Sequence, residues 1–386
     1  MKIIHTADIH LNSKMDSCLS GEKAKQRKQE LLLTFSKMVD YAKKENATAI
    51  IIAGDLFDTD TINKSTSEFL LDTIKNNEDI KFIYLCGNHE KQSFSNYIKS
   101  VPQNLLIFDD EWKYYNIGQN VVVAGVAITK ENSKSIYPKL KLSKDNTNIV
   151  VMHGQISKYF VQDNFEIVNL TELKNKNINY LALGHIHSFE QGKLDDNAIY
   201  AYSGCLEGRG FDECGKKGFV ELDISNGKIT PTFIPFAKRD IVEVKVDISN
   251  VVGLKEIDNK IKQQIKTISL TSLVKVNLIG EISEDVNLDI SFLENALNEI
   301  FFFAKIENNT KLKVDLDRYK NDVSIKGEFI RNVLNSALSD MEKEQVILLG
   351  IKALNGEVDL WKYYHFTYKI LENLITLIIL LIHKKM

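Results

Sequence analysis

Short apolar runs alternate with helical patterns over the first 240 or so residues. Six runs rich in Ile and Val have the length and composition of buried strands: Lys2–His5, Ala49–Ala53, Lys81–Cys86, Val121–Val126, Asn148–Met152 and Tyr180–Leu183. Apolar residues at helical spacing predict helices over Gln26–Lys44 and Lys64–Asn76, between the first three runs. This alternation predicts an α/β fold with parallel strands and right-handed crossovers.

The pattern changes near Lys238, after a predicted hairpin whose turn is Ser225-Asn226-Gly227. The next predicted elements are a strand, a helix, a strand, a helix and a strand: Ile241–Ile248, Leu254–Ile268, Leu273–Ile279, a helix marked by Ile290 to Ile300, and Lys311–Leu316. From Lys326 the pattern is helical. We therefore predict three domains, with the body at 1–240, a small α+β domain at 241–322 and a helical region at 323–386.

Composition indicates the class of protein and excludes some kinds of partner surface. The 386 residues are 44% hydrophobic and 26% charged, as in an ordinary soluble protein, and the formal charge of −3 excludes a uniformly basic body. No CxxC pair supports a zinc ribbon. Scattered cysteines and the absence of a signal-peptide pattern lead us to expect a cytoplasmic protein. The longest apolar run, Leu374–Ile382, is shorter than the roughly 20 residues that span a bilayer, so no stable membrane insertion is expected.

Polar clusters follow five of the predicted strands directly. They are Asp8-Ile9-His10, Gly54-Asp55-Leu56-Phe57-Asp58, Gly87-Asn88-His89-Glu90, His153-Gly154 and Gly184-His185-Ile186-His187. In open α/β sheets, ligands bind at the carboxyl ends of the strands. A single strand-end His or Asp is more often a turn former or a helix cap, but five such clusters on successive strand ends predict one site.

The residue types in these clusters suit a centre for two metal ions. Imidazole and carboxylate groups favour Mn²⁺, Fe²⁺ or Zn²⁺, and two such ions can activate a water while they hold phosphate oxygens. Seven candidate ligands are too many for one tetrahedral ion and suit two: Asp8, His10, Asp55, Asn88, His153, His185 and His187. Glycines before Asp55, Asn88 and His185 allow tight turns and a close approach to a phosphate.

The series D-x-H, GDxxD, GNH[DE], H and GHxH resembles that of the calcineurin-like metallophosphoesterases over residues 1–235. The resemblance implies a β-sandwich flanked by helices, in four layers αββα, followed here by the small α+β cap and the helical tail. One ion would be held by Asp8, His10, Asp55 and His187, and the other by Asp55, Asn88, His153 and His185. His89 would face the phosphate and protonate the leaving oxygen, and Asp58 would orient His89. Mn²⁺ is the expected metal, with Fe²⁺ and Zn²⁺ as alternatives.

Two motifs resemble those of the SbcD-type DNA repair exonucleases, the partners of SMC-like ATPases. They are the opening His5-Thr6-Ala7-Asp8-Ile9-His10-Leu11 and Gly54-Asp55-Leu56-Phe57-Asp58. The loop from Tyr202 to Glu213 is similar to that of a Gram-positive branch of this group. The resemblance implies an exonuclease/endonuclease that acts on double-stranded ends or single-stranded DNA, an SMC-like ATPase partner and a homodimer. A nucleotide or cyclic-nucleotide phosphodiesterase, or a DNA-end-binding scaffold with vestigial activity, remains the alternative.

DNA contacts are expected from residues near these motifs. The candidates are Lys91, Tyr97, Arg209, Lys216 and Lys217, and a basic cluster at the start of the first helix adds Lys23, Lys25, Arg27 and Lys28. The alternative for each charge run is a solvated face, and for Arg209 a solvated glycine-rich loop. The apolar face of Ile330, Leu334 and Leu338 fits either a packed helix pair or a grip on the ATPase coiled coil.

Overall fold

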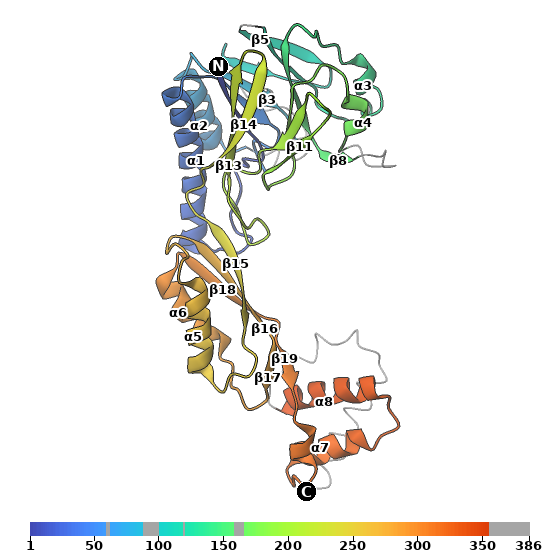
Figure 1. The fold of residues 1–386 in the computed structure, drawn as a ribbon. Helices are drawn as coiled ribbons and strands as arrows, with labels where there is room; N and C mark the ends of the chain where they lie inside the picture. Colours follow the sequence, from blue (N-terminus) through green and yellow to red (C-terminus); the bar gives the residue numbers. More distant parts are fainter. Residues whose placement is uncertain (59–61, 88–99, 119, 158–165, 355–386) are drawn as a thin grey trace. The chain divides into compact units, whose positions relative to one another are not determined.

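The computed structural model describes residues 1–58, 62–87, 100–118, 120–157 and 166–354 (Figure 1). The described residues do not include Asn88, His89, Lys91, Tyr97 or the apolar run Leu374–Ile382. The chain divides into two compact units, of which the first comprises Met1–Glu243, Ser269–Lys275 and Phe301–Phe303. The second comprises Val244–Ile268, Val276–Ile300 and Ala304–Met386. The predicted division into three domains stays a prediction.

The first unit contains two six-stranded sheets. The first has the order β14-β13-β1-β2-β3-β4, and β1 to β4 run parallel. Its strands are β1 Lys2–Thr6, β2 Ala47–Ala53, β3 Lys81–Leu85, β4 Leu105–Ile107, β13 Gly218–Ser225 and β14 Lys228–Pro235. The second has the order β11-β12-β10-β7-β6-β5, and its four central strands run parallel. Its strands are β5 Lys113–Gly118, β6 Val121–Gly125, β7 Thr147–His153, β10 Tyr180–Gly184, β11 Glu190–Lys193 and β12 Ile199–Tyr202.

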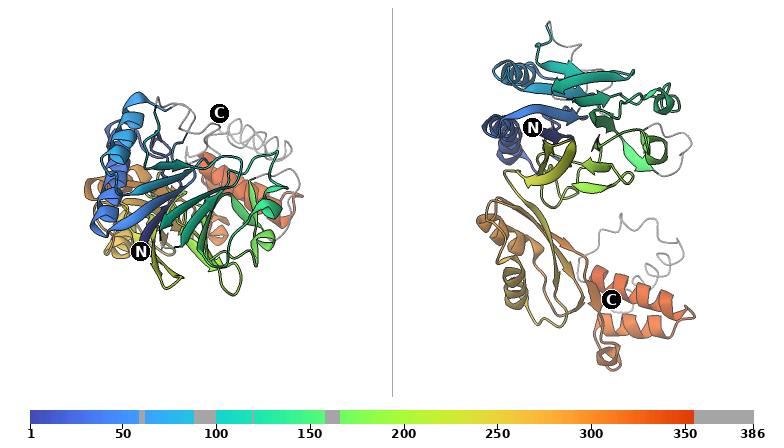
Figure 2. Two further views of the ribbon diagram at one scale, coloured as in Figure 1. Left: turned by 90° about the horizontal axis from the view of Figure 1, so that it is seen from above. Right: turned by 45° about the horizontal axis from the view of Figure 1, so that its top comes forward.

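Helices cover the outer faces of both sheets, which gives four layers (Figure 2). Helices α1 (Gly21–Lys44) and α2 (Lys64–Lys75) pack on the first sheet, where Ile50 and Ile52 of β2 join Phe35 of α1 in one buried cluster. Ile51 points the other way and packs between the sheets with Val151 of β7. Short helices α3 (Ile136–Lys139) and α4 (Leu170–Leu173) cover the second sheet. The central strands are buried on both faces, which explains why they form continuous apolar runs in the sequence. The predicted αββα arrangement is confirmed.

The predicted hairpin in the first sheet also forms as expected. The chain turns between β13 and β14 at Asn226 and Gly227, whose φ angles of 51° and 76° are those of a two-residue hairpin turn. A separate pair of short parallel strands, β8 (Gln155–Ser157) and β9 (Ile167–Asn169), follows β7.

The elements after residue 240 form a small three-stranded sheet with two helices. Its strand order is β15-β16-β18, and β17 pairs separately with β19. In chain order the elements are β15 Ile241–Asp247, α5 Leu254–Ile265, β16 Leu273–Ile279, β17 Glu281–Ser283, α6 Ile290–Ile300, β18 Phe303–Asn308 and β19 Lys311–Lys313. One expectation is corrected, because the predicted strand Lys311–Leu316 ends at Lys313. Leu316 instead begins the 3-10 turn η2 (Leu316–Tyr319), where the Asp315 side chain caps the turn.

The helical region contains a packed pair, α7 (Ile325–Leu334) and α8 (Asp340–Leu354). Phe329 and Ile330 of α7 are buried with Ile347 and Ile351 of α8. The structure therefore gives Ile330 the role of an ordinary core residue, the first of the two predicted alternatives. Within the described ranges, no helix has both the length and the apolar character needed to cross a membrane.

Candidate metal centre

Polar side chains from the ends of four strands, two in each sheet, converge in the first unit. Asp8 and His10 follow β1, Asp55 follows β2, His153 closes β7 and His187 follows β10. The backbone amide of His10 donates to the carbonyl oxygen of Asp55 (3.0 Å), which ties the first two strand ends together. The predicted convergence at the carboxyl ends of the strands is therefore present for all five of these residues.

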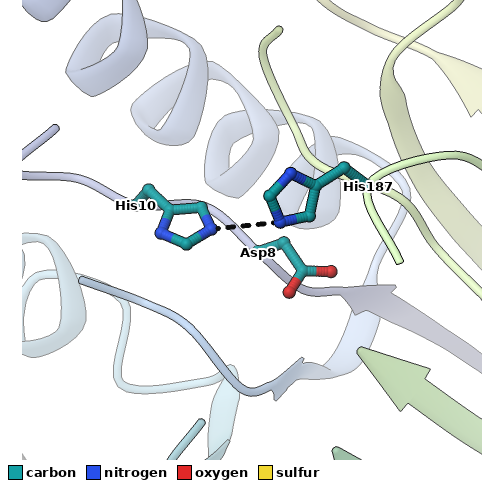
Figure 3. A group of neighbouring side chains, drawn as sticks. All are labelled: Asp8, His10 and His187. Atoms are coloured by element: carbon teal, nitrogen blue, oxygen red, sulfur yellow. Dashed lines mark hydrogen bonds between the residues drawn. The ribbon is translucent and has the colours of Figure 1, made fainter. Parts of the chain in front are cut away.

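Asp8, His10 and His187 form the first group of candidate cation ligands. One potential ligand atom from each lies within 4.8 Å of the other two. The two histidines face each other, with 3.4 Å between their Nε2 atoms (Figure 3). Two nitrogens bound to one tetrahedral ion at about 2.0–2.1 Å lie about 3.3 Å apart. The ring nitrogens are therefore already spaced as ligands of a single cation.

A second group contains Asp8, Asp55 and His153. The Nε2 atom of His153 lies 3.4 Å from Oδ2 of Asp55, and its Nδ1 lies 2.9 Å from the carbonyl oxygen of Ala53. Because a carbonyl only accepts, Nδ1 carries the proton and Nε2 faces the carboxylates. Asp8 belongs to both groups, whereas the sequence predicts Asp55 as the shared ligand. The bridging role of Asp55 stays a prediction.

His185 belongs to neither group but lies beside both. Its backbone N–H donates to the Asp8 carboxylate at 2.9 and 3.1 Å, and its ring packs edge-on against that of His153, with 5.5 Å between centroids. This amide fixes the orientation of the Asp8 carboxylate. The predicted ligand role of His185 stays a prediction.

Burial makes the centre suited to a cation. Asp8 and Asp55 are each only 1% exposed, and burial together with the neighbouring Asp55 raises the pKa of Asp8. Burial alone would lower the pKa of His153, but the hydrogen bond and charge of Asp55, with the charge of Asp8, raise it to about 9. A divalent cation would stabilise both carboxylates and displace the proton from His153. The residues present therefore fit the divalent metals that prefer mixed imidazole and carboxylate ligands.

The backbone is held in an unusual conformation at the same residues. Asp8, His10, Asp55 and His185 all have positive φ, at 50°, 51°, 48° and 104°. Non-glycine residues adopt this region at a cost, and such residues cluster at functional sites. Gly54 has a φ of 97°, and a Cβ there would collide with the His153 ring. The glycine of GDxxD is thus needed for the packing of a candidate ligand, a reason that the sequence does not reveal.

Asp58 contacts the first group from outside. Its Oδ1 lies 3.1 Å from Nδ1 of His10 and accepts a hydrogen bond from Nη1 of Arg209 at 2.7 Å. Its predicted contact with His89 lies outside the described residues. Asp58 therefore lies beside His10 as a neighbouring negative charge, in addition to the role expected from the sequence.

Comparison with known families identifies this architecture. Residues 1–189 match the model of the calcineurin-like phosphoesterase family. The N-terminal part of this chain is therefore similar to that family. The superfamily expected from the strand-end motifs is confirmed, and the calcineurin-like phosphoesterase fold is one that holds two divalent ions. The Gram-positive subgroup stays a prediction.

Three relatives carry the name DNA double-strand break repair protein Mre11. The protein of Sulfolobus acidocaldarius is 24% identical, over 88% of this chain and 88% of its own length. That of Thermoplasma acidophilum is 27% identical, over 74% and 80% of the two chains. That of Saccharolobus solfataricus is 25% identical, over 65% and 68%. The similarity therefore extends beyond the phosphoesterase domain in at least two of the three.

The structure changes the interpretation of three predicted DNA contacts on the phosphoesterase domain. Lys217 is only 2% exposed and donates from Nζ to the carbonyl oxygen of His187 at 2.6 Å, so its predicted contact with DNA is withdrawn. Lys216 has a 63% exposed side chain, which pairs with Asp240 at 2.7 Å. Arg209 is engaged by carboxylates, with a side chain 19% exposed. Only Lys216 of these three presents its charge to solvent.

Glu213 is the residue of this phosphoesterase centre that sequence reasoning missed. It is 4% exposed, and its Oε1 lies 2.6 Å from Nδ1 of His187. Burial alone would raise the pKa of Glu213, but the contacts of His187 and Arg209 hold it well below its ordinary value. Glu213 lies in the loop between β12 and β13, where no hydrophobic period marks it. The only signal in the sequence that could have indicated Glu213 is that it is a carboxylate in the loop from Tyr202 to Glu213, for which a function was already expected.

Proposed function

We propose that this chain is a two-metal phosphodiesterase that hydrolyses DNA phosphodiester bonds in DNA repair. The observation that carries the proposal is Asp8, a buried carboxylate that belongs to two groups of cation ligands at once. Two ions that share a ligand form the arrangement that clamps both oxygens of an in-line displacement. The relatives named for double-strand break repair, one of them matched over 88% of this chain, support DNA as the polymer.

The ligands of the proposed centre come from five strand ends. We propose Asp8, His10, Asp55 and His187 for one ion and Asp55, Asn88, His153 and His185 for the other. Mn²⁺ is the proposed metal because the two described groups mix imidazole with carboxylate and contain no cysteine. Fe²⁺ and Zn²⁺ share these preferences, and comparison of activity with each metal distinguishes them.

The chain's own residues supply orientation and proton transfer. When bound, the two ions would polarise the phosphate and lower the pKa of a coordinated water. Asp8 and Asp55 provide the negative charge that holds the ions in a buried setting. We propose that His89 protonates the leaving oxygen, a role that suits an imidazole because its pKa lies close to neutrality. Asp58, whose carboxylate lies beside His10, is the proposed partner of His89.

Contacts with DNA and with other proteins complete the proposal. Lys216 remains a proposed backbone contact because its side chain is exposed, and Lys91 and Tyr97 remain proposed contacts after the third motif. The resemblance supports the proposal of an SMC-like ATPase partner and a homodimer, and the scattered cysteines support that of a cytoplasmic location. Light scattering on the purified protein tests the dimer, since one chain has a mass of 44.0 kDa.

A substrate panel tests the function. Purified protein with Mn²⁺ is expected to degrade end-labelled duplex or single-stranded DNA at least about tenfold faster than it cleaves mononucleotide or cyclic-nucleotide phosphodiesters. Cleavage confined to the small substrates would replace the proposal with a nucleotide phosphodiesterase. Tight binding of DNA ends without cleavage of any substrate would replace it with a scaffold.

A further inference from the structure

Each histidine of the first ligand group has a carboxylate oxygen close to its Nδ1 atom. Glu213 Oε1 lies 2.6 Å from Nδ1 of His187, and Asp58 Oδ1 lies 3.1 Å from Nδ1 of His10. The opposite nitrogens, the two Nε2 atoms, face each other at 3.4 Å (Figure 3). A carboxylate at Nδ1 fixes both the rotation of an imidazole ring and the nitrogen that is free to bind a metal.

One guanidinium joins these two carboxylates. Arg209 donates from Nη1 to Oδ1 of Asp58 at 2.7 Å, and from Nε and Nη2 to Oε1 of Glu213 at 2.9 and 2.8 Å. The backbone amide of Arg209 also donates to Oε2 of Glu213 at 2.7 Å. The planar fork of arginine can meet two acceptors at fixed angles, which a lysine ammonium cannot do in the same way.

The second ligand group has a different support. Nδ1 of His153 donates to the carbonyl oxygen of Ala53 at 2.9 Å, and Ala53 is the last residue of strand β2. That contact depends on the sheet backbone and not on the loop that carries Arg209 and Glu213. A substitution in the loop should therefore change the orientation of His10 and His187 and leave that of His153 unchanged.

We propose that Arg209 and Glu213 are positioning residues that set the affinity of one of the two cation sites, the one built on His10 and His187. The inference rests on the proposed two-metal function. It gives Arg209 a task different from the DNA contact expected from sequence: its charge neutralises two buried or half-buried carboxylates, each of which orients a ligand. Loss of such an outer partner lowers metal affinity by roughly 10–100-fold in known metal sites.

Manganese titration of the full-length protein tests the inference. Binding of Mn²⁺ is followed by calorimetry and by the electron paramagnetic resonance signal of the free ion, for wild type, Glu213→Gln and Arg209→Lys. Wild type is expected to bind two ions. In both variants, the affinity for one ion is expected to fall by about 10–100-fold, and the affinity for the other is expected to stay within about twofold of the wild-type value. Asp212→Asn is the matched control, since it removes the same charge from an exposed side chain one residue away.

The outcomes separate the two proposals. Unchanged binding of both ions in Glu213→Gln would overturn the positioning role, as would an equal loss at both sites, which indicates general damage to the fold. Wild-type affinity in Arg209→Lys would show that charge suffices and that the bridge between two carboxylates does not matter. If wild type binds two ions and the variants lose one, but no DNA is cleaved, the positioning role stands and the proposed function fails.

Discussion

Replacement of Asp55 with asparagine is expected to lower the rate of DNA cleavage by more than about 100-fold without unfolding the protein. Asp55 lies within the second ligand group, 3.4 Å from the ring nitrogen of His153. Loss of an outer-shell partner already costs up to about 100-fold in activity or affinity. Removal of the charge from a direct ligand should cost more, because an amide oxygen holds a divalent cation less strongly than a carboxylate does.

The choice of asparagine protects the fold in this test. Asp55 has a φ of 48°, a left-handed conformation that Asn tolerates better than most residues, and the two side chains have nearly the same shape. Initial rates are measured on labelled DNA at saturating Mn²⁺, with the thermal midpoint of each protein recorded. Asp196→Asn, on an exposed loop, is the control and should cleave at the wild-type rate. A wild-type rate for Asp55→Asn would remove Asp55 from the ligand set.

Replacement of Arg27 with methionine is expected to lower the free energy of unfolding by about 3–5 kcal/mol. Arg27 has a side chain only 1% exposed, and it donates to Glu30 and to Glu207 at 2.7 Å each. Glu207 is also buried, so loss of Arg27 leaves its carboxylate without its main counter-charge. Breaking a buried ion pair from one side carries this large cost because the remaining charge has no water to solvate it.

A second arginine, Arg239, belongs to the same buried network of charges. Arg239 donates to both carboxylate oxygens of Glu30, at 2.8 and 2.6 Å, and its guanidinium stacks 3.6 Å from the ring centroid of Phe302. Urea unfolding of Arg27→Met measures the effect. The control is Lys25→Met on the same helix, with a 67% exposed side chain and an expected change within about 0.5 kcal/mol. Equal stability of the two variants would show that the network contributes no more than surface charge.

The sequence predicted the body of the phosphoesterase domain because its strands are buried on both faces. Ile50 and Ile51 point to different layers and are both fully buried, so the strand shows as an unbroken apolar run. The polar edge strand β11, Glu190–Lys193, has no such run and was not predicted. Strand β18, Phe303–Asn308, was missed because most of its side chains after Ala304 are exposed and charged or polar.

The candidate ligands could be predicted because each lies at the end of its strand or within a few residues after it. The residues that support them could not, since their partners are distant along the chain. Arg27 looked like one of four surface charges, yet its partner Glu207 is 180 residues away. Arg209 looked like a DNA contact, yet it bridges Glu213 to Asp58, which lies 151 residues earlier. The local pattern of polar and apolar residues does not indicate contacts between residues so far apart in the sequence. Only the folded structure shows these pairs.

The most direct test of the central claim is hydrolysis of end-labelled duplex DNA by the wild-type protein in the presence and absence of Mn²⁺. The two-metal centre predicts cleavage with Mn²⁺, its loss on chelation with EDTA and its return when Mn²⁺ is restored in excess. Cleavage that persists unchanged in EDTA would contradict a metal-dependent mechanism at these strand ends. DNA that stays intact with Mn²⁺, Fe²⁺ and Zn²⁺ alike would contradict the assignment of DNA as the substrate of this chain.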